Sequence, residues 1–130
     1  MNNTYEIRHA AHPLDVKKYD TERLREEFLV QNLMSNGQIK IVYSEYDRYI
    51  VGGAIPITPI KLETIDPLKS NYFLERRELG LINVGGTGLV KVDGKEFNLK
   101  FKEAIYIGRG NKEIIFESIN RNDPDRKSVV

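Results

Sequence analysis

The sequence predicts an all-β sandwich or barrel with one helix near the N-terminus. Its 130 residues contain several short segments in which apolar and polar side chains alternate, the pattern of half-buried strands. Turn signals separate these segments at intervals of about eight to twelve residues, which is typical of sandwiches and barrels. The clearest strands lie between residues 72 and 119, and the rest of the chain is organised around them.

A β-hairpin forms the centre of this region. The pair Asp93-Gly94 favours the left-handed backbone angles of a tight two-residue turn. In that register Val90 faces Phe97 and Lys91 faces Glu96, so apolar and opposite-charge pairs both form across the strands. A slip by one residue would turn the apolar face outward, which specifies the register. This apolar face carries five residues: Val90, Val92, Phe97, Leu99 and Phe101.

Further strands are predicted on both sides of the hairpin, at 38–44, 46–60, 61–65, 79–84, 103–107 and 112–119. The segment 46–60 is expected to bend at Gly52 and Gly53 and to end as an edge strand that Pro56 and Pro59 interrupt. Glycine-rich turns at 85–88 and 108–110 follow the strands at 79–84 and 103–107. This order of strands and turns resembles the cupin double-stranded β-helix.

The composition excludes several classes of protein and site. Twenty basic and 19 acidic residues give a formal charge of +1, which predicts no nucleic-acid partner. The absence of cysteine excludes disulfides and Cys-ligated zinc. No apolar run reaches the length of a membrane span, and the first residues lack the apolar core of a signal peptide. We therefore expect a cytoplasmic location.

The chain is predicted to divide into an irregular N-terminal arm at 1–19, a cupin-like domain at 20–119 and a charged, unstructured tail at 120–130. The predicted helix covers 20–30, with Asp20 or Thr21 as its N-cap. Leu24 and Phe28 lie four residues apart and form a narrow apolar stripe, which we expect to pack against the sheet.

The cupin pattern offers two candidate positions in the interior of the barrel. Cupin enzymes usually hold a metal through His-x-His, a Glu and a later His. Glu78 matches the Glu, and Glu113 occupies the position of the last His. The His-x-His positions fall on other residue types, either Tyr72 and Leu74 or Asn71 and Phe73. Because one ligand of four remains, Glu78 and Glu113 are interpreted as vestigial pocket positions, with no catalytic residue, metal site or cofactor.

Two other groups of polar residues have alternative interpretations. His9 and His12 lie close together, but two imidazoles without a third ligand are weak evidence for a metal, and a solvated or packed pair is favoured. The charge cluster at 75–78, Glu-Arg-Arg-Glu, is compatible with a carboxylate-binding site because arginine offers a bidentate fork. The favoured interpretation is two ordinary ion pairs, one on each face of a strand, because alternation would direct Glu75 and Arg77 to one face and Arg76 and Glu78 to the other. Glu78 is accordingly expected to pair with Arg76 or Arg77.

Four segments together resemble the 5-keto-4-deoxyuronate isomerases, the 4-deoxy-L-threo-5-hexosulose-uronate ketol-isomerases of pectin breakdown. They lie at 24–30, 43–58, 72–86 and 104–113, and the run Tyr-Phe-Leu-Glu-Arg-Arg-Glu-Leu-Gly at 72–80 is the most specific. The resemblance implies a sugar-acid isomerase with two cupin halves, usually a hexamer. Its zinc would lie in the second half, and catalysis would move a proton between adjacent carbons through an enediol.

The resemblance covers about residues 8 to 120, and no residue of the chain matches the zinc ligands of the family. The resemblance therefore implies that this chain corresponds to the N-terminal cupin half and is inactive alone. We expect the chain to be a truncated or frame-shifted product, or a fragment. The alternative is a non-catalytic structural or carbohydrate-binding cupin module. Uncovered strand edges predict a homo-oligomer, most simply a two-fold dimer, and a uronate sugar is a possible ligand.

Overall fold

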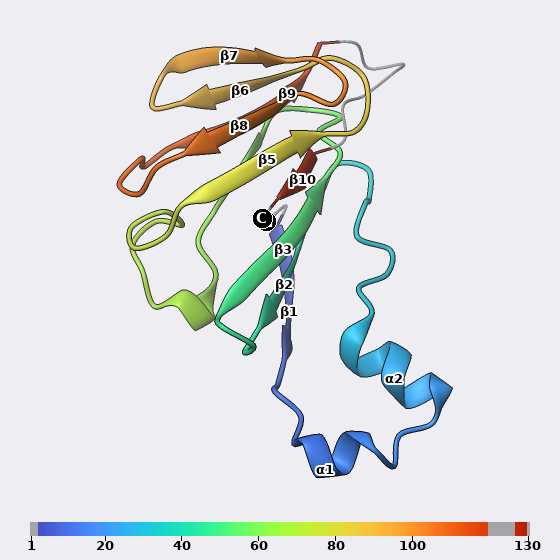
Figure 1. Ribbon diagram of the computed structural model, residues 1–130. Coiled ribbons are helices and arrows are strands. Elements are labelled where there is room, and N and C mark those ends of the chain that lie inside the picture. Colours follow the sequence, from blue (N-terminus) through green and yellow to red (C-terminus); the bar gives the residue numbers. More distant parts are fainter. Residues whose placement is uncertain (1–2, 120–126, 130) are drawn as a thin grey trace.

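A computed structural model describes residues 3–119 and 127–129 and shows a mostly β structure built from two sheets (Figure 1). The six-stranded sheet has the order β1-β2-β3-β10-β5-β8, and the four-stranded sheet has the order β4-β9-β6-β7. Neighbouring strands are antiparallel except for β1 and β2. The elements in chain order are β1 Asn3–Arg8, α1 Pro13–Val16, α2 Thr21–Phe28, β2 Ile39–Ser44, β3 Tyr49–Ala54, β4 Ile60–Lys61, the 3-10 helix η1 Asp66–Leu68, β5 Leu79–Asn83, β6 Gly88–Val92, β7 Lys95–Leu99, β8 Ala104–Ile107, β9 Ile114–Ser118 and β10 Lys127–Val129.

The core lies between the two sheets. Alternation along β2 directs Ile39 and Ile41 inward, and Leu81 of β5 joins them. The four-stranded sheet contributes Val90 and Phe116, both fully buried. Each such side chain stabilises the fold by roughly 1.5–3 kcal/mol relative to an exposed position. The alternating pattern therefore identified inward-facing positions on both sheets.

The structure confirms the predicted hairpin and its register. Val90 pairs with Phe97 and Lys91 with Glu96 across β6 and β7. Asp93 and Gly94 both have positive φ, 47° and 87°, as a two-residue turn of this kind requires. Strands also form within the other predicted ranges, with two exceptions. The edge strand expected in the second part of 46–60 is wrong, because β3 ends at Ala54 and β4 begins only at Ile60. The strand expected at 61–65 is wrong beyond Lys61, where the chain leaves β4.

The bend predicted at Gly52 and Gly53 is wrong, because both residues lie inside β3. Gly53 is required for a different reason. A Cβ atom built on it would lie 2.8 Å from the backbone oxygen of Leu33 and 2.8 Å from the sulfur of Met34. The glycine thus allows the segment that follows α2 to cross β3 at close range.

The irregular arm expected at 1–19 is wrong for two segments. Asn3–Arg8 form β1, whose side chains are mostly exposed, so the strand is held by parallel pairing with β2 rather than by an apolar face. Pro13 begins α1, a position that suits proline because the first helical residue needs no N–H donor. The His12 ring accepts a hydrogen bond from the Leu14 amide at 3.1 Å and caps this helix.

Helix α2 begins as predicted, since the Asp20 carboxylate accepts a hydrogen bond from the Arg23 amide at 2.8 Å. It ends at Phe28, and the prediction that it packs on the sheet is wrong. Leu24 and Phe28 are 39% and 48% exposed, and both helices lie beyond the lower end of the sheets (Figure 1). The Phe28 ring contacts the ring of Tyr46 in the β2–β3 turn instead, with centroids 6.2 Å apart.

The unstructured tail expected at 120–130 is wrong for Lys127–Val129, which form β10 between β3 and β5. Residues 120–126 lie outside the described residues, and the division of the chain at residues 19 and 119 stays a prediction. Across residues 3–119 and 127–129, no helix has the length and apolar character needed to cross a membrane.

Candidate functional site

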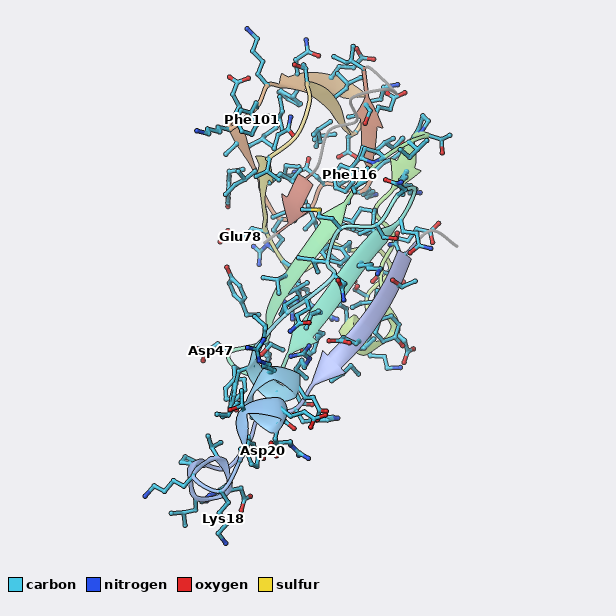
Figure 2. All side chains as sticks on the ribbon, turned by 90° about the vertical axis from the view of Figure 1, so that its right-hand side faces the viewer. Lys18, Asp20, Asp47, Glu78, Phe101 and Phe116 are labelled. Atoms are coloured by element: carbon cyan, nitrogen blue, oxygen red, sulfur yellow. The ribbon has the colours of Figure 1, made fainter. Side chains whose placement is uncertain are left out.

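The candidate site is a cavity of about 870 Å³ beside the first residues of β3 and β5 and the last residues of β8. β10 separates β3 from β5 only opposite Gly52–Ala54 and Leu81–Asn83. Figure 2 shows Glu78, one of its residues, at the side of the molecule between the levels of Phe116 and Asp47. The polar lining consists mainly of Arg48, Arg76, Arg77, Glu78, Tyr106 and Arg109.

Arg76 holds the loop before β5 against the 3-10 helix. Its guanidinium donates to the backbone oxygens of Leu68 and Lys69 at 2.8 and 2.9 Å. The neighbouring Glu75 accepts hydrogen bonds from the backbone and side-chain nitrogens of Asn71 at 3.0 and 3.2 Å. The loop geometry thus directs these two charged side chains to partners other than each other.

Arg77 connects the same loop to the β2–β3 turn. Its guanidinium donates to the backbone oxygen of Arg48 at 2.8 Å and lies 5.5 Å from the centroid of the Tyr43 ring. This cation–π contact and the hydrogen bond fix the arginine beside β3.

The two ion pairs predicted within 75–78 are therefore wrong. That prediction required a strand, and β5 starts only at Leu79. In the loop that precedes it, strict alternation of side chains between two faces does not apply.

Glu78 makes its hydrogen bond with β8 instead of with an arginine. The Tyr106 hydroxyl donates to Glu78 Oε2 at 2.5 Å. This hydrogen bond raises the pKa of Tyr106 above its ordinary value of 10.0, and desolvation and the negative charge of Glu78 act in the same direction. The phenol therefore stays protonated, and one carboxylate oxygen of Glu78 is occupied.

The second predicted position, Glu113, lies elsewhere. Its amide donates to Asp93 Oδ1 at 2.8 Å and its backbone oxygen accepts from the Asp93 amide at 2.9 Å, beside the β6–β7 turn. It does not line the cavity that contains Glu78. The structure thus does not bring the two predicted pocket positions together.

The residues at the cupin ligand positions do not fit zinc. Phe73 and Leu74 are buried in the core, with 5% and 0% of their surface exposed. The described part of the chain holds no group of three His, Cys, Asp or Glu side chains placed to bind a metal. His9 is bonded to Glu45 at 3.0 Å, and His12 caps α1. Zinc binding by this chain stays untested.

Sequence reasoning missed two arginines of the site. Arg48 precedes β3 and Arg109 follows β8, 61 residues further along the chain, and the fold brings both to one cavity. The available signal was Arg109 between two glycines in a turn. Within the described part of the chain, none of the four cavity arginines forms an ion pair with a carboxylate. The arrangement presents bidentate donors to an anion.

Comparison with curated proteins finds close relatives over about half of their length. The chain is 57% identical over 125 residues to a 4-deoxy-L-threo-5-hexosulose-uronate ketol-isomerase from Formosa agariphila, which covers 95% of this chain and 45% of the relative. A protein of the same description from Bacteroides fragilis is 50% identical over 125 residues, with the same coverage. The corresponding protein of Oceanobacillus iheyensis is 48% identical over 127 residues, 96% of this chain and 46% of the relative.

Comparison with solved structures identifies the fold, although no family model matches the chain. A cupin-2 domain-containing protein from Shewanella frigidimarina superposes with a TM-score of 0.51 at 12% identity, over 90% of this chain and 97% of that one. This confirms the predicted cupin fold. The long matches at high identity, each to about 45% of a relative, make the chain a half-length homologue of the 4-deoxy-L-threo-5-hexosulose-uronate ketol-isomerase family.

Proposed function

We propose that this chain is the N-terminal cupin half of a cytoplasmic 4-deoxy-L-threo-5-hexosulose-uronate ketol-isomerase and is inactive alone. The full enzyme would interconvert 5-dehydro-4-deoxy-D-glucuronate and 3-deoxy-D-glycero-2,5-hexodiulosonate. The observation that carries the proposal is the 57% identity to the Formosa agariphila relative over 125 residues, 45% of that protein. Such identity over a continuous half supports a shared enzyme rather than only a shared fold.

The placement of the chain's basic and acidic groups supports a non-catalytic role. Isomerisation through an enediol needs a base close to the substrate carbon and a group that stabilises the developing oxyanion. Both histidines lie outside the candidate cavity, His9 against Glu45 and His12 at the start of α1. In the cavity, Glu78 is the acidic residue, and its carboxylate is bonded to Tyr106. The arginines that surround it favour binding over proton transfer.

The exposed apolar side chains support a role in assembly. β1 is an edge strand of the six-stranded sheet, and its Tyr5 and Ile7 are 45% and 40% exposed. The apolar stripe of α2, Leu24 and Phe28, is exposed near the same end of the molecule. Edge strands and apolar patches of this kind are sites of association. We propose that the chain forms a homo-oligomer, most simply a two-fold dimer, through this surface.

An activity assay with metal analysis tests the proposed function. The purified 130-residue chain and the full-length Formosa agariphila relative are each incubated with 5-dehydro-4-deoxy-D-glucuronate. We expect isomerisation by the relative and none by this chain, together with less than stoichiometric zinc in this chain by elemental analysis. Turnover by this chain at a rate near that of the relative would contradict the proposal. One tightly held zinc per chain would contradict its metal-free part.

A second candidate function, a carbohydrate-binding cupin module, is favoured by one observation. Four arginines and two exposed tyrosines line a single cavity of a size suited to a monosaccharide. This role is compatible with a non-catalytic half, and it requires a defined ligand.

A further inference from the structure

We propose that two copies of this chain associate by pairing their β1 strands antiparallel, about a two-fold axis that passes beside Ile7. In this register Glu6 of each copy lies opposite Arg8 of the other. The pairing rests on the homo-oligomer proposed above and goes further, because it fixes the partner, the strand and the register of the contact.

β1 is an edge strand that carries none of the usual features that prevent pairing. Among the described strands its neighbour is β2, and Figure 2 shows β1, the blue arrow, at the side of the sheet away from β3. Its sequence, Asn-Thr-Tyr-Glu-Ile-Arg, contains neither the lysine nor the proline that commonly protects an edge. The edge strand β7 begins with Lys95, and the edge strands β4 and β8 have only two and four residues. β1 is therefore the edge best suited to accept another strand.

The backbone of β1 presents donors and acceptors on its free side at alternate residues. The Arg8 carbonyl accepts a hydrogen bond from the Glu45 amide at 2.9 Å, so the backbone groups of Arg8 face β2. In a parallel pair the N–H and C=O of one residue point to the same side, and the side changes at each residue. The backbone groups of Glu6 therefore also face β2, whereas those of Tyr5 and Ile7 face away from it. An incoming strand can form hydrogen bonds with Tyr5 and Ile7.

Charge selects one register among those that the backbone allows. Antiparallel registers centred on Tyr5, Glu6 or Ile7 each bring the free backbone groups of two copies together. A centre at Glu6 places the two Glu6 carboxylates directly opposite each other, which is unfavourable. A centre at Tyr5 places Glu6 opposite Thr4 and gives Arg8 no acidic partner. A centre at Ile7 places Glu6 opposite Arg8 on both sides of the axis, so this register is favoured.

Glu6 and Arg8 are already oriented for these pairs. Arg8 Nε donates to Glu6 Oε1 at 2.8 Å, and Arg8 Nη2 donates to the Leu29 carbonyl at 3.0 Å. These bonds fix the guanidinium and leave Arg8 Nη1 and Glu6 Oε2 without a hydrogen bond to another described residue. The Glu6 side chain is 55% exposed. Strand pairing would join the ion pairs of the two copies into one cluster of alternating charges.

The other face of β1 supplies an apolar contact in the same register. Tyr5 and Ile7 lie beside Ile41 and Tyr43 of β2, on the face that continues into the core, and are 45% and 40% exposed. At the two-fold axis the Ile7 side chains of the two copies would pack against each other and lose exposed apolar surface. The overlap covers only residues 5–9, so the interface is small. We expect a dimer with a Kd of roughly 1–100 µM.

Sedimentation equilibrium of the 130-residue chain with charge-reversed variants tests the register. Glu6→Arg and Arg8→Glu each place like charges opposite each other, so each variant alone should raise the Kd of the dimer by about tenfold or more. An equimolar mixture of the two variants should form a heterodimer with a Kd near that of wild type, because every opposed pair then has opposite charges. Lys95→Glu reverses the same charge on β7 and should leave the Kd unchanged.

A backbone variant tests the same contact without any change of charge at positions 6 and 8. Ile7→Pro removes an N–H that faces the free side and no hydrogen bond to β2, so the fold should be kept and the dimer lost. Far-UV circular dichroism and thermal unfolding check the fold. In the wild-type chain, hydrogen exchange of the Ile7 amide should slow as the protein concentration rises.

The outcomes separate this pairing from the proposals on which it builds. A wild-type chain that stays monomeric at high concentration would overturn both the strand pairing and the proposed homo-oligomer. A dimer that persists in Ile7→Pro would overturn the pairing and leave the homo-oligomer standing. The same holds if the mixture of folded Glu6→Arg and Arg8→Glu chains stays monomeric while wild type dimerises. The isomerase assay does not depend on any of these results.

Discussion

The Tyr106 hydroxyl on β8 donates a hydrogen bond to the carboxylate of Glu78, the residue immediately before β5, with 2.5 Å between the two oxygens. This contact joins two residues 28 positions apart and places a neutral phenol and a carboxylate at the edge of an arginine-lined cavity. It has a consequence that pH titration can measure.

Glu78→Gln should lower the pKa of Tyr106 toward its ordinary value of 10.0. The hydrogen bond to Glu78 is the largest cause of the raised pKa, and the amide removes the negative charge that disfavours the phenolate. Because the folded pKa is raised, the stabilisation from this contact is present below the unfolded pKa and is lost as pH rises through the folded pKa. NMR titration of the Tyr106 ring checks this, and an unchanged titration curve would contradict the contact.

Gly94→Val should destabilise the chain by about 1–3 kcal/mol. Gly94 has φ of 87°, which a β-branched residue adopts only under strain, and a Cβ there meets nothing within 4 Å. The cost is therefore conformational. Gly108→Ala is the control, because its Cβ also meets nothing within 4 Å and its backbone does not lie in the left-handed region. Equal urea midpoints for the two variants would contradict the two-residue turn.

Gly53→Ala should also destabilise the fold, by about 1–3 kcal/mol, but through steric overlap. The added Cβ would lie 2.8 Å from the Leu33 backbone oxygen, and a backbone atom cannot move aside as a flexible side chain does. Thermal unfolding compared with wild type and Gly108→Ala measures the cost. A Tm equal to that of wild type would mean that the 33–34 segment does not cross β3 as described.

The chain should form a homo-oligomer, most simply a dimer, at micromolar concentration. Ile7→Glu places a charge on the exposed edge strand β1 and should shift the population toward monomer, since burying an unpaired carboxylate at an interface is costly. Phe101→Glu alters a residue that is 58% exposed in the turn between β7 and β8 and should leave the assembly unchanged. Light scattering distinguishes these outcomes. A wild-type monomer that binds no apolar dye would contradict the expectation.

The local features of the fold could be predicted from the sequence. Asp93 and Gly94 determine their turn by their own backbone preferences, and the alternation on both sides then sets the register of β6 and β7. Asp20 caps α2 through a hydrogen bond with the amide of Arg23, only three positions further along the chain. The resemblance to the isomerase family also followed from contiguous sequence, because the run at 72–80 is read directly from the chain. These features depend on neighbours in sequence, whose relationship is fixed before the chain folds.

Only the tertiary structure decided which segments far apart in the sequence contact one another. The side chains of β1 are mostly exposed, so no apolar periodicity predicted this strand, and parallel pairing with β2 holds it. β10 is defined by its backbone pairing with β3 and β5. The loop before β5 separates charges that a strand would have paired, and it directs Glu78 to Tyr106. The candidate site combines Arg48 and Arg109, which lie 61 positions apart in the chain. Such contacts depend on long-range closure of the sheets, which side-chain periodicity does not encode.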